Sequence, residues 1–393
     1  MNRKEAFLNY QAQITQTPFL LDVKKAEGSY IYTHENKKYL DLVAGVSSCT
    51  LGHSHPSIIN AAKQQLDEHT HVMVYGEFIQ TRPLKLAIAY GKYLPKELSC
   101  TYIVNSGTEA IEGAIKLAKR KNRRKKIISC VNSYHGSTQG SMSAMGTDLM
   151  KKKYEPLIPF HENIRYNNLE DLSILNENIA AIIIEPVQGG TNFITANKEW
   201  LHTIRDRCNK YSIELIFDEI QTGFGRTGKM FGFEIYNIKP DILCIAKGMG
   251  GGMPIGAFIS SKSNMSLLSH NPALGHITTF GGHPVSCAAA LATWTELINS
   301  DLIQSVNQKR ELFIKNLQHP KIQKIHGIGL MLALELKNDK YCEKIVKKLL
   351  INRVITFYFL FNRNNVRISP PLTISENEII SACDIIKKVL DEN

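Results

Sequence analysis

The sequence predicts an α/β fold built on a parallel sheet. Four short apolar runs in the middle of the chain have the length and composition of buried strands, at 127–131, 180–186, 215–220 and 241–246. Amphipathic helical patterns separate them, and this alternation is typical of βαβ units around a parallel sheet. A chain of 393 residues can bury roughly three-quarters of its unfolded surface, so no metal or disulfide is needed for stability.

The helical pattern is clearest at 108–120. Apolar residues recur there on one face of the expected helix, at Ala110, Ile111, Ala114, Ile115 and Ala118. Another strand, Ile255–Ser260, follows a glycine-rich turn. Over the last ninety or so residues the pattern changes to an apolar strand at 329–336, a lysine-rich helix, two strand-like runs and a terminal helix. We expect this part to form a separate α+β unit.

Composition excludes several classes of protein. With 43% hydrophobic and 21% charged residues, the chain is ordinary globular protein and not disordered or coiled coil. No stretch approaches 18 consecutive apolar residues, so we expect no membrane span, and the polar N-terminus lacks the apolar core of a secretion signal. The eight cysteines form no CxxC pair, which indicates reduced thiols in a cytoplasmic protein. Two HxH pairs, His53/His55 and His69/His71, lack ligands at metal-site spacing, so no metal is expected.

The net charge of +11 raises the question of nucleic-acid binding. Much of the charge lies in the run Lys119–Lys126 and the triplet Lys151–Lys153. Neither run has interleaved aromatic residues or belongs to a nucleic-acid-binding motif. The first run closes an apparent helix, where cations suit the negative end of the helix dipole. We therefore interpret it as a solvated helix end and expect no nucleic-acid partner; retardation by heparin or DNA at physiological salt would test the alternative.

The segment that begins at Gly223 matches two nucleotide-binding patterns, and its context fails both. A P-loop requires Ser or Thr after the lysine, but Met230 follows Lys229. A dinucleotide-binding fold requires a helix at the third glycine, and the residues after Gly228 have no helical face. The segment therefore predicts neither a P-loop nor a dinucleotide-binding site.

The residue with the most informative position is Lys247, which ends an apolar strand and precedes a flexible glycine-rich turn. Side chains at the carboxyl ends of parallel strands face the crevice where open α/β sheets bind ligands. Removal from water lowers the pKa of a lysine, and the resulting neutral amine can form a Schiff base. One crossover earlier a strand ends in Asp218, so an amine and a carboxylate are expected at the same sheet edge. They form either a plain salt bridge or the arrangement that pyridoxal phosphate (PLP) needs, in which a carboxylate keeps the ring nitrogen protonated.

Two further motifs supply what a phosphorylated aromatic cofactor needs. Asn105-Ser106-Gly107-Thr108-Glu109 opens the predicted helix, and the free N–H groups of a helix start form an anion site. Taken alone, the same residues are merely a good N-cap. Tyr134 follows the strand at 127–131, where an aromatic ring either stacks on a planar ligand or packs in the core.

These motifs together resemble the class III (ω-amino-acid) PLP-dependent aminotransferases. The similar segments are NSGTEA (105–110), YHG (134–136), IIEPVQG (183–189), DEIQTGFGRTG (218–228), AKGMGGGMPIGA (246–257) and TTFGGHP (278–284), and the resemblance covers nearly the whole chain. It implies the aspartate-aminotransferase-like fold (PLP fold type I), with a mostly parallel seven-stranded sheet in a large domain and a smaller α+β domain. The expected division is 51–295 for the large PLP-binding domain and 296–393 for the small domain, to which 1–50 contributes.

The resemblance also implies a role for each site residue. Lys247 binds the cofactor covalently and moves the proton, and Asp218 pairs with the pyridine nitrogen. Gln221 contacts the phenolic oxygen, and Glu185 supports the site from behind. Tyr134 stacks on the cofactor ring. The other cofactor-binding positions of the same chain are Ser106, Gly107, Thr108 and His135. The resemblance also implies a homodimer with shared active sites, in which Thr279 reaches the cofactor of the partner subunit. Substrate-binding positions are Arg367, as the carboxylate-binding arginine, Ser137 and Thr278.

Within the family the chain is most similar to the acetylornithine and ornithine aminotransferases, with two departures. There an arginine follows the aromatic-HG motif, where this chain has Ser137, and a glutamate that pairs with the C-terminal arginine follows EPIQG, where this chain has Gly190. Losing a charge-assisted contact worth about 1.5–3 kcal/mol changes substrate choice by more than about tenfold. The expected reaction moves the terminal amine of such a donor to a 2-oxo acid such as 2-oxoglutarate. GABA, lysine or diaminopelargonate-type substrates, with pyruvate as an acceptor, remain alternatives.

Three alternative functions make different demands on the site. In glutamate-1-semialdehyde aminomutases the position of Gln221 is typically methionine and the arginine seen here as Arg367 is absent, so both residues favour a transferase. A dialkylglycine-type decarboxylase would release carbon dioxide. A non-enzymatic protein that kept the fold would not need every cofactor contact, and all of them are present.

Overall fold

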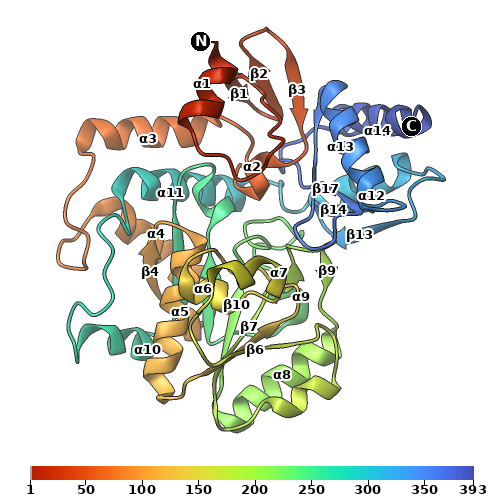
Figure 1. Ribbon diagram of the computed structural model, residues 1–393. Coiled ribbons are helices and arrows are strands. Elements are labelled where there is room, and N and C mark those ends of the chain that lie inside the picture. Colours follow the sequence, from red (N-terminus) through yellow and green to blue (C-terminus); the bar gives the residue numbers. More distant parts are fainter. Residues whose placement is uncertain (1) are drawn as a thin grey trace.

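The computed structural model describes residues 2–393 and places a seven-stranded sheet at the centre of the molecule (Figure 1). All strands run parallel except β12, which lies antiparallel between β4 and β11. This confirms the predicted α/β class and the mostly parallel sheet. In spatial order the strands are β4 (Cys100–Val104), β12 (Gly256–Ser260), β11 (Ile242–Ile245), β10 (Glu214–Asp218), β7 (Ile179–Ile184), β5 (Lys126–Cys130) and β6 (His161–Ile164).

Helix α5 (Gly107–Asn122) packs along this sheet because one of its faces is apolar. The predicted residues Ala110, Ile111, Ala114, Ile115 and Ala118 are all buried, as expected from their spacing. The helix begins where the Ser106 side chain accepts a hydrogen bond from the amide of Glu109, and it ends at Arg123, whose backbone is left-handed.

Other helices surround the sheet. Helix α11 (Pro284–Asn299) packs on α3 (Pro56–Glu68) and α4 (Thr81–Tyr93). The remaining helices of this part are α8 (Lys198–Tyr211), α6 (Gln139–Ser143), α7 (Asp148–Lys151), α9 (Phe233–Tyr236) and α10 (Lys262–Ser266). Short 3₁₀ turns lie at Lys96–Leu98, Lys152–Tyr154, Glu170–Ile174, Lys247–Gly250 and Leu267–Ser269, and a small hairpin joins β8 (Val187–Gln188) to β9 (Ile194–Thr195).

The two ends of the chain lie side by side and form two smaller sheets (Figure 1). In one, the N-terminal strands β1 (Val23–Glu27), β2 (Tyr30–Thr33) and β3 (Lys38–Asp41) are joined by C-terminal β15 (Val354–Ile355). The other contains β13 (Lys324–Ile328), β14 (Met331–Glu335), β17 (Asn365–Ile368) and β16 (Phe357–Tyr358). The helices of these parts are α1 (Arg3–Tyr10), α2 (Ala44–Ser47), α12 (Val306–Asn316), α13 (Asp339–Ile351) and α14 (Glu376–Asp391).

The glycine-rich segment after Gly223, for which the sequence favours neither nucleotide-binding pattern, connects two parts of the fold. It forms turns in which Gly225 and Gly228 have positive φ, and no helix begins at Gly228. The Arg226 side chain is buried and donates hydrogen bonds to the carbonyl oxygens of Leu330 and Pro370. The segment therefore attaches the end of β10 to the C-terminal sheet.

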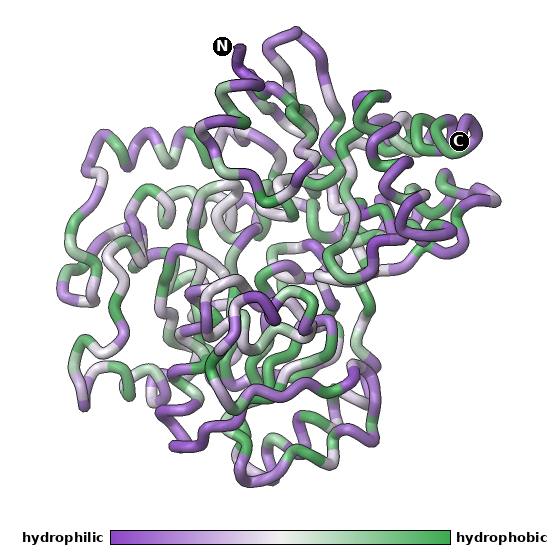
Figure 2. The backbone as a smooth tube through the Cα atoms, in the orientation of Figure 1, coloured by the Kyte–Doolittle hydropathy of each residue, from purple (hydrophilic) through white to green (hydrophobic). Residues whose placement is uncertain are grey.

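Apolar residues concentrate in the interior and polar residues at the periphery, as Figure 2 shows. Every residue of β7 and β10 is buried, which is typical of central strands covered on both faces. All eight cysteines are free thiols. Among residues 2–393, no helix has the length and hydrophobicity needed to cross a membrane.

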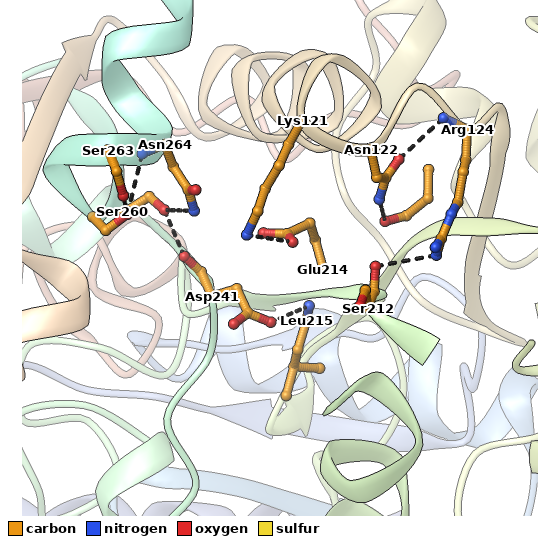
Figure 3. A network of polar contacts seen from close by, with 12 residues as sticks. Lys121, Asn122, Arg124, Ser212, Glu214, Leu215, Asp241, Ser260, Ser263 and Asn264 are labelled. Atoms are coloured by element: carbon orange, nitrogen blue, oxygen red, sulfur yellow. Dashed lines mark hydrogen bonds and ion pairs between the residues drawn. The ribbon is translucent and has the colours of Figure 1, made fainter. Parts of the chain in front are cut away.

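The basic run Lys119–Lys126 has a structural role that the sequence did not indicate. It lies at the amino edge of the sheet, where strands β10 and β11 begin (Figure 3). Lys121 forms an ion pair with buried Glu214 at 2.7 Å. The Arg124 guanidinium donates to three carbonyl oxygens, of Ile179, Tyr211 and Ser212. The interpretation as a merely solvated helix end is therefore wrong for these two residues, because Lys121 pairs with a buried carboxylate and Arg124 donates to backbone carbonyl oxygens.

Candidate active site

Lys247 and Asp218 meet at the carboxyl edge of the sheet, as their sequence positions predict. Strands β10 and β11 are parallel neighbours with Asp218 opposite Cys244, and Lys247 follows two residues after β11. Lys247 has a positive φ of 44° in a 3₁₀ turn, an uncommon conformation for a residue with a side chain. Removal from water lowers the pKa of its amine, an effect that the negative charge of Asp218 partly opposes.

Asp218 is held by two donors. Its Oδ2 atom lies 2.7 Å from Nδ1 of His135, and its Oδ1 atom accepts from the amide of Ile220 at 3.1 Å. Burial alone would lower the pKa of His135, but the hydrogen bond and charge of Asp218, with Glu185, raise it above its ordinary value. The imidazole therefore fixes the orientation of the carboxylate.

Glu185 holds two loops that line the cavity. Its carboxylate accepts from the amides of Gly189 at 3.0 Å and Tyr134 at 3.3 Å. Burial raises the pKa of Glu185, and the His135 charge opposes the shift. The side chain thus ties the loop after β5 to the loop after β7, two segments that both line the site.

The residues expected to hold a phosphate lie together at the start of α5. Ser106 caps the helix, and the first N–H groups of the helix have no acceptor within it. The Thr108 hydroxyl oxygen lies 2.7 Å from the hydroxyl oxygen of Thr138 and 2.7 Å from that of Ser141. A Cβ atom at Gly107 would lie 2.8 Å from Cδ1 of Ile220, so glycine lets this turn lie close to the segment that follows β10.

Tyr134, Ser137 and Gln221 line the walls of the same cavity. The Tyr134 hydroxyl lies 3.0 Å from the Ser137 hydroxyl, so Ser137 is directed at the tyrosine. Gln221 donates to the Ser47 hydroxyl at 3.3 Å. Ser47 belongs to a turn at Ala44–Ser47 in which all four residues have positive φ. Left-handed residues other than glycine cost about 1–2 kcal/mol each, so this turn stores strain beside the cavity.

Arg367 reaches the cavity from β17 of the C-terminal sheet. It is buried between two aromatic rings, with its guanidinium carbon 4.5 Å from the Phe359 centroid and 5.2 Å from that of Phe193. Its Nη2 donates to the carbonyl of Gly189. Burial lowers the pKa of Arg367 to about 10, so the side chain remains a cation at neutral pH.

Thr278 and Thr279 lie outside the cavity that this chain forms by itself. The Thr278 hydroxyl accepts from the side-chain amide of Asn105 at 2.8 Å, next to the phosphate-binding turn. Thr279 is exposed. The other predicted residues, from five separate segments of the large sheet and from β17, border one cavity of about 700 Å³. Among residues 2–393, no group of three or more His, Cys, Asp or Glu side chains is arranged to hold a metal ion.

Comparison with known proteins identifies the family to which this arrangement belongs. The sequence model of the family described as aminotransferase class-III matches residues 11–390. The chain is a class-III aminotransferase. Among curated relatives, the acetylornithine aminotransferase of Clostridium acetobutylicum is 34% identical over 383 residues, covering 94% of this chain and 96% of the relative.

Solved structures agree with this family. The ornithine aminotransferase of Toxoplasma gondii superimposes with a TM-score of 0.91 at 28% identity, covering 100% of this chain and 96% of that one. An amine transaminase from an uncultivated Pseudomonas species, solved in its PLP-bound form, gives a TM-score of 0.87 at 25% identity over 97% of this chain and 98% of that one. The class-III aminotransferase described here is accordingly a PLP-dependent transferase.

The cavity has the features that PLP requires. Lys247 forms no ion pair with a carboxylate of the described chain, so its amine is available. The Nε2 atom of His135 is buried and has no partner, and it lines the cavity. The glycine turn and helix start at Gly107 offer free N–H groups to a dianion. The residues of this class-III aminotransferase therefore fit the cofactor.

Sequence reasoning missed several parts of the site. It gave no partner for Gln221, because no pattern predicts the left-handed turn that brings in Ser47. It also missed Phe193 and Phe359, which enclose Arg367. A signal existed only for Phe359, which lies in the aromatic strand-like run before Arg367.

Proposed function

We propose that this enzyme transfers the terminal amine of an ω-amino acid or diamine-type donor to a 2-oxo acid such as 2-oxoglutarate. Acetylornithine and ornithine are the preferred donors, because the relatives named above carry those names. The observation that carries the proposal is the amine of Lys247 beside the His135-oriented carboxylate of Asp218, in a cavity that also contains a buried guanidinium.

Lys247 is the proposed catalytic residue. PLP, when bound, supplies an aromatic ring that withdraws electrons from the substrate's amine-bearing carbon. Because burial lowers the pKa of Lys247, its amine is more readily neutral than that of an exposed lysine. In its neutral form Nζ of Lys247 would accept a proton from this carbon of the donor, and in the second half-reaction it would deliver a proton to the corresponding carbon of the 2-oxo acid. Asp218, fixed by His135, would pair with the pyridine nitrogen of the cofactor and favour its protonated form, and Gln221 would contact the phenolic oxygen.

The remaining predicted residues bind and orient. Ser106, Gly107 and Thr108 hold the phosphate at the start of α5, and Tyr134 stacks on the ring. Arg367 binds a substrate carboxylate, and Ser137 borders the substrate path in the same cavity. Thr278, outside the cavity of its own chain, would border that path from a partner subunit. Glu185 holds the two loops that carry Tyr134 and Gly189.

The proposed assembly is a homodimer with shared active sites. Thr279 supports this proposal because it is exposed on its own chain and lies outside that chain's cavity, so it is free to reach the phosphate of a partner subunit. We also propose the division into a large domain at 51–295 and a small domain at 296–393 joined by 1–50, which the pairing of β3 with β15 supports. The proposed location is the cytoplasm, consistent with eight free cysteines.

A donor panel tests the proposed reaction. Purified enzyme is assayed with acetylornithine, ornithine, GABA, lysine and a diaminopelargonate precursor, each with 2-oxoglutarate and with pyruvate. Amine transfer from an ω-amino donor supports the proposal. Carbon dioxide release without net transfer, or isomerisation of a single substrate, would replace it with a decarboxylase or an aminomutase.

A companion variant tests the account of position 137. Ser137→Arg restores a cation beside Tyr134 and should lower the KM for 2-oxoglutarate by about tenfold, since one charge-assisted contact is gained. Ser137→Gln is the matched control of similar reach without charge. An unchanged KM in the arginine variant would show that Ser137 does not set dicarboxylate preference.

A further inference from the structure

Cys49 and His53 lie at the two ends of a tight turn that follows Ala44–Ser47. The amide of Gly52 donates to the carbonyl oxygen of Cys49 at 3.0 Å, and Gly52 has a positive φ of 84°. A Cβ atom at Gly52 would lie 2.9 Å from the carbonyl oxygen of Gly28, which also accepts from the amide of His53. In this turn the Cys49 side chain and the His53 ring form a hydrogen bond with each other.

Asp41 keeps the His53 ring in place as a cation. Its Oδ2 atom lies 2.8 Å from Nε2 of His53, and its Oδ1 atom accepts from the amides of Val43 at 2.8 Å and Ala44 at 3.1 Å. The hydrogen bonds of Asp41 and Cys49 raise the pKa of His53 to about 10, against the opposing effect of burial. The imidazole is therefore protonated at neutral pH, and a cation faces the sulfur of Cys49.

A second cation acts on the same thiol. Burial lowers the pKa of Arg226 to about 10, and the charge of Cys49 opposes this shift. The Nε and Nη2 atoms of Arg226 are buried and have no hydrogen-bond partner, and within residues 2–393 Arg226 forms no ion pair. A buried cation without an anion is costly, so a thiolate at Cys49 would supply the negative charge that both cations favour.

Cys49 is also open to small molecules. Only Cys49 and Cys100 are partly exposed, and the other six cysteines are buried. A Cβ atom at Gly252 would lie 3.5 Å from the sulfur of Cys49, and Gly252 lines the cavity, so the thiol lies directly behind the cavity wall. Cysteines that are partly exposed and beside cations are the reactive ones, whereas buried cysteines are inert.

We propose that Cys49 is a nucleophilic thiolate and a site of covalent modification by hydrogen peroxide. The sulfur attacks one oxygen of the peroxide, so that an S–O bond forms and the O–O bond breaks. The departing hydroxide takes a proton from His53 and becomes water. The sulfur is oxidised to a sulfenic acid, and the peroxide is reduced. Asp41 is a positioning residue that acts through His53. This site uses none of the residues assigned to amine transfer and does not depend on that assignment.

Site-by-site labelling of the PLP-loaded enzyme tests the proposal. The reduced enzyme is treated with hydrogen peroxide in the presence of dimedone, which traps sulfenic acids, and the adducts are quantified by peptide mass spectrometry. Cys49 should be labelled at least about tenfold faster than Cys100. Cys100 is the internal control, because among residues 2–393 no hydrogen bond or ion pair joins its side chain to a cation. Equal rates at the two cysteines, or no labelling at Cys49, would overturn the proposal.

Paired histidine variants test the role of the imidazole. His53→Gln removes the cation beside the sulfur and should slow Cys49 labelling by about tenfold at an unchanged Cys100 rate. Asp41→Asn should slow it in the same direction, because the ring loses its anionic partner. His55→Gln, two residues along the same loop, is the matched control and should change neither rate. A Cys49 rate that is the same in His53→Gln as in the wild type would contradict the proposal.

The wild-type comparison of Cys49 with Cys100 decides the proposal even if a substitution prevents folding, which thermal melts detect. Cys49→Ala should remove the labelling assigned to this site and retain amine transfer, because Cys49 is not among the proposed cofactor or substrate contacts. Persistent labelling of the same peptide in Cys49→Ala would refute the site. Loss of amine transfer in the wild type with intact Cys49 labelling would refute the proposed function alone.

Discussion

The amino edge and the carboxyl edge of the central sheet both gather charged side chains but pair them differently. At the amino edge Lys121 pairs with Glu214 and Arg124 donates to backbone carbonyl oxygens (Figure 3). Arg205 also pairs with Asp241 at this edge. At the carboxyl edge Lys247 and Arg367 border the cavity, and within residues 2–393 neither of these two cations forms an ion pair with a carboxylate. Polar groups that satisfy one another stabilise the fold, whereas groups left open in a cavity are free to bind ligands.

The largest expected effect comes from removing the amine at the carboxyl edge. Lys247→Ala should lower amine transfer by at least about 10⁴-fold, because the proposed proton carrier and cofactor attachment are lost together. Its melting temperature without PLP should not fall, because the amine has no ion pair to lose. Turnover assays and thermal melts measure both. Lys121→Ala, the control at the opposite edge, should lower stability and leave turnover intact; the reverse pattern would contradict the comparison.

The two aspartates give the next largest contrast. Asp218→Asn should reduce kcat by about 10²–10³-fold, because a neutral amide no longer holds a proton on the cofactor's ring. Asp241→Asn, at the amino edge, weakens its bonds to Arg205 and the amide of Leu215 and should mainly lower the unfolding free energy. Steady-state kinetics and urea unfolding distinguish the two. A kcat loss of equal size in both variants would contradict the proposed role of Asp218 at the cofactor ring.

A single arginine tests the amino edge alone. Arg124→Ala leaves three carbonyl oxygens without their donor and should reduce the unfolding free energy by about 2 kcal/mol at unchanged kcat. Urea unfolding measures the loss. Lys125→Ala, a neighbouring exposed residue, is the control and should change stability by less than about 0.5 kcal/mol. If both variants behave alike, the carbonyl contacts contribute nothing measurable.

The smallest effect is a pH dependence at the amino edge. Burial raises the pKa of Glu214 above its usual 4.5, and the Lys121 hydrogen bond only partly opposes this. A raised carboxyl pKa contributes stability that is complete below pH 4.5 and is lost as pH rises through the folded value. The wild type should therefore lose stability from pH 4 to pH 8, whereas Glu214→Gln should not. The unfolding free energy of the variant minus that of the wild type should increase over this range. A difference that stays constant over this range would show that Glu214 titrates normally.

Sequence alone predicted much of this fold because its signals are local. Apolar runs marked β5, β7, β10 and β11 to within two residues, and the meeting of Asp218 with Lys247 followed from the geometry of parallel strands. Contacts between distant segments had no such signal. The hydrogen bond between Gln221 and Ser47, and the packing of Phe361 on Gly190, depend on how the C-terminal sheet and the left-handed turn dock against the large sheet.

The amino edge was misjudged for the same reason. A run of lysines and arginines at a helix end predicts a solvent-exposed helix end when only the neighbouring residues are considered. Whether Arg124 turns back toward the carbonyls of Tyr211 and Ser212 is decided by a helix that begins more than seventy residues later.

The antiparallel strand β12 has a consequence for the order in which the molecule assembles. It closes the gap between β11 and β4, and β4 lies about 150 residues earlier in the chain. Such a distant pairing carries a high loop-closure cost and forms late. Because Lys247 precedes β12, we expect its amine to be removed from water only after this pairing forms, so that PLP binds a completed site.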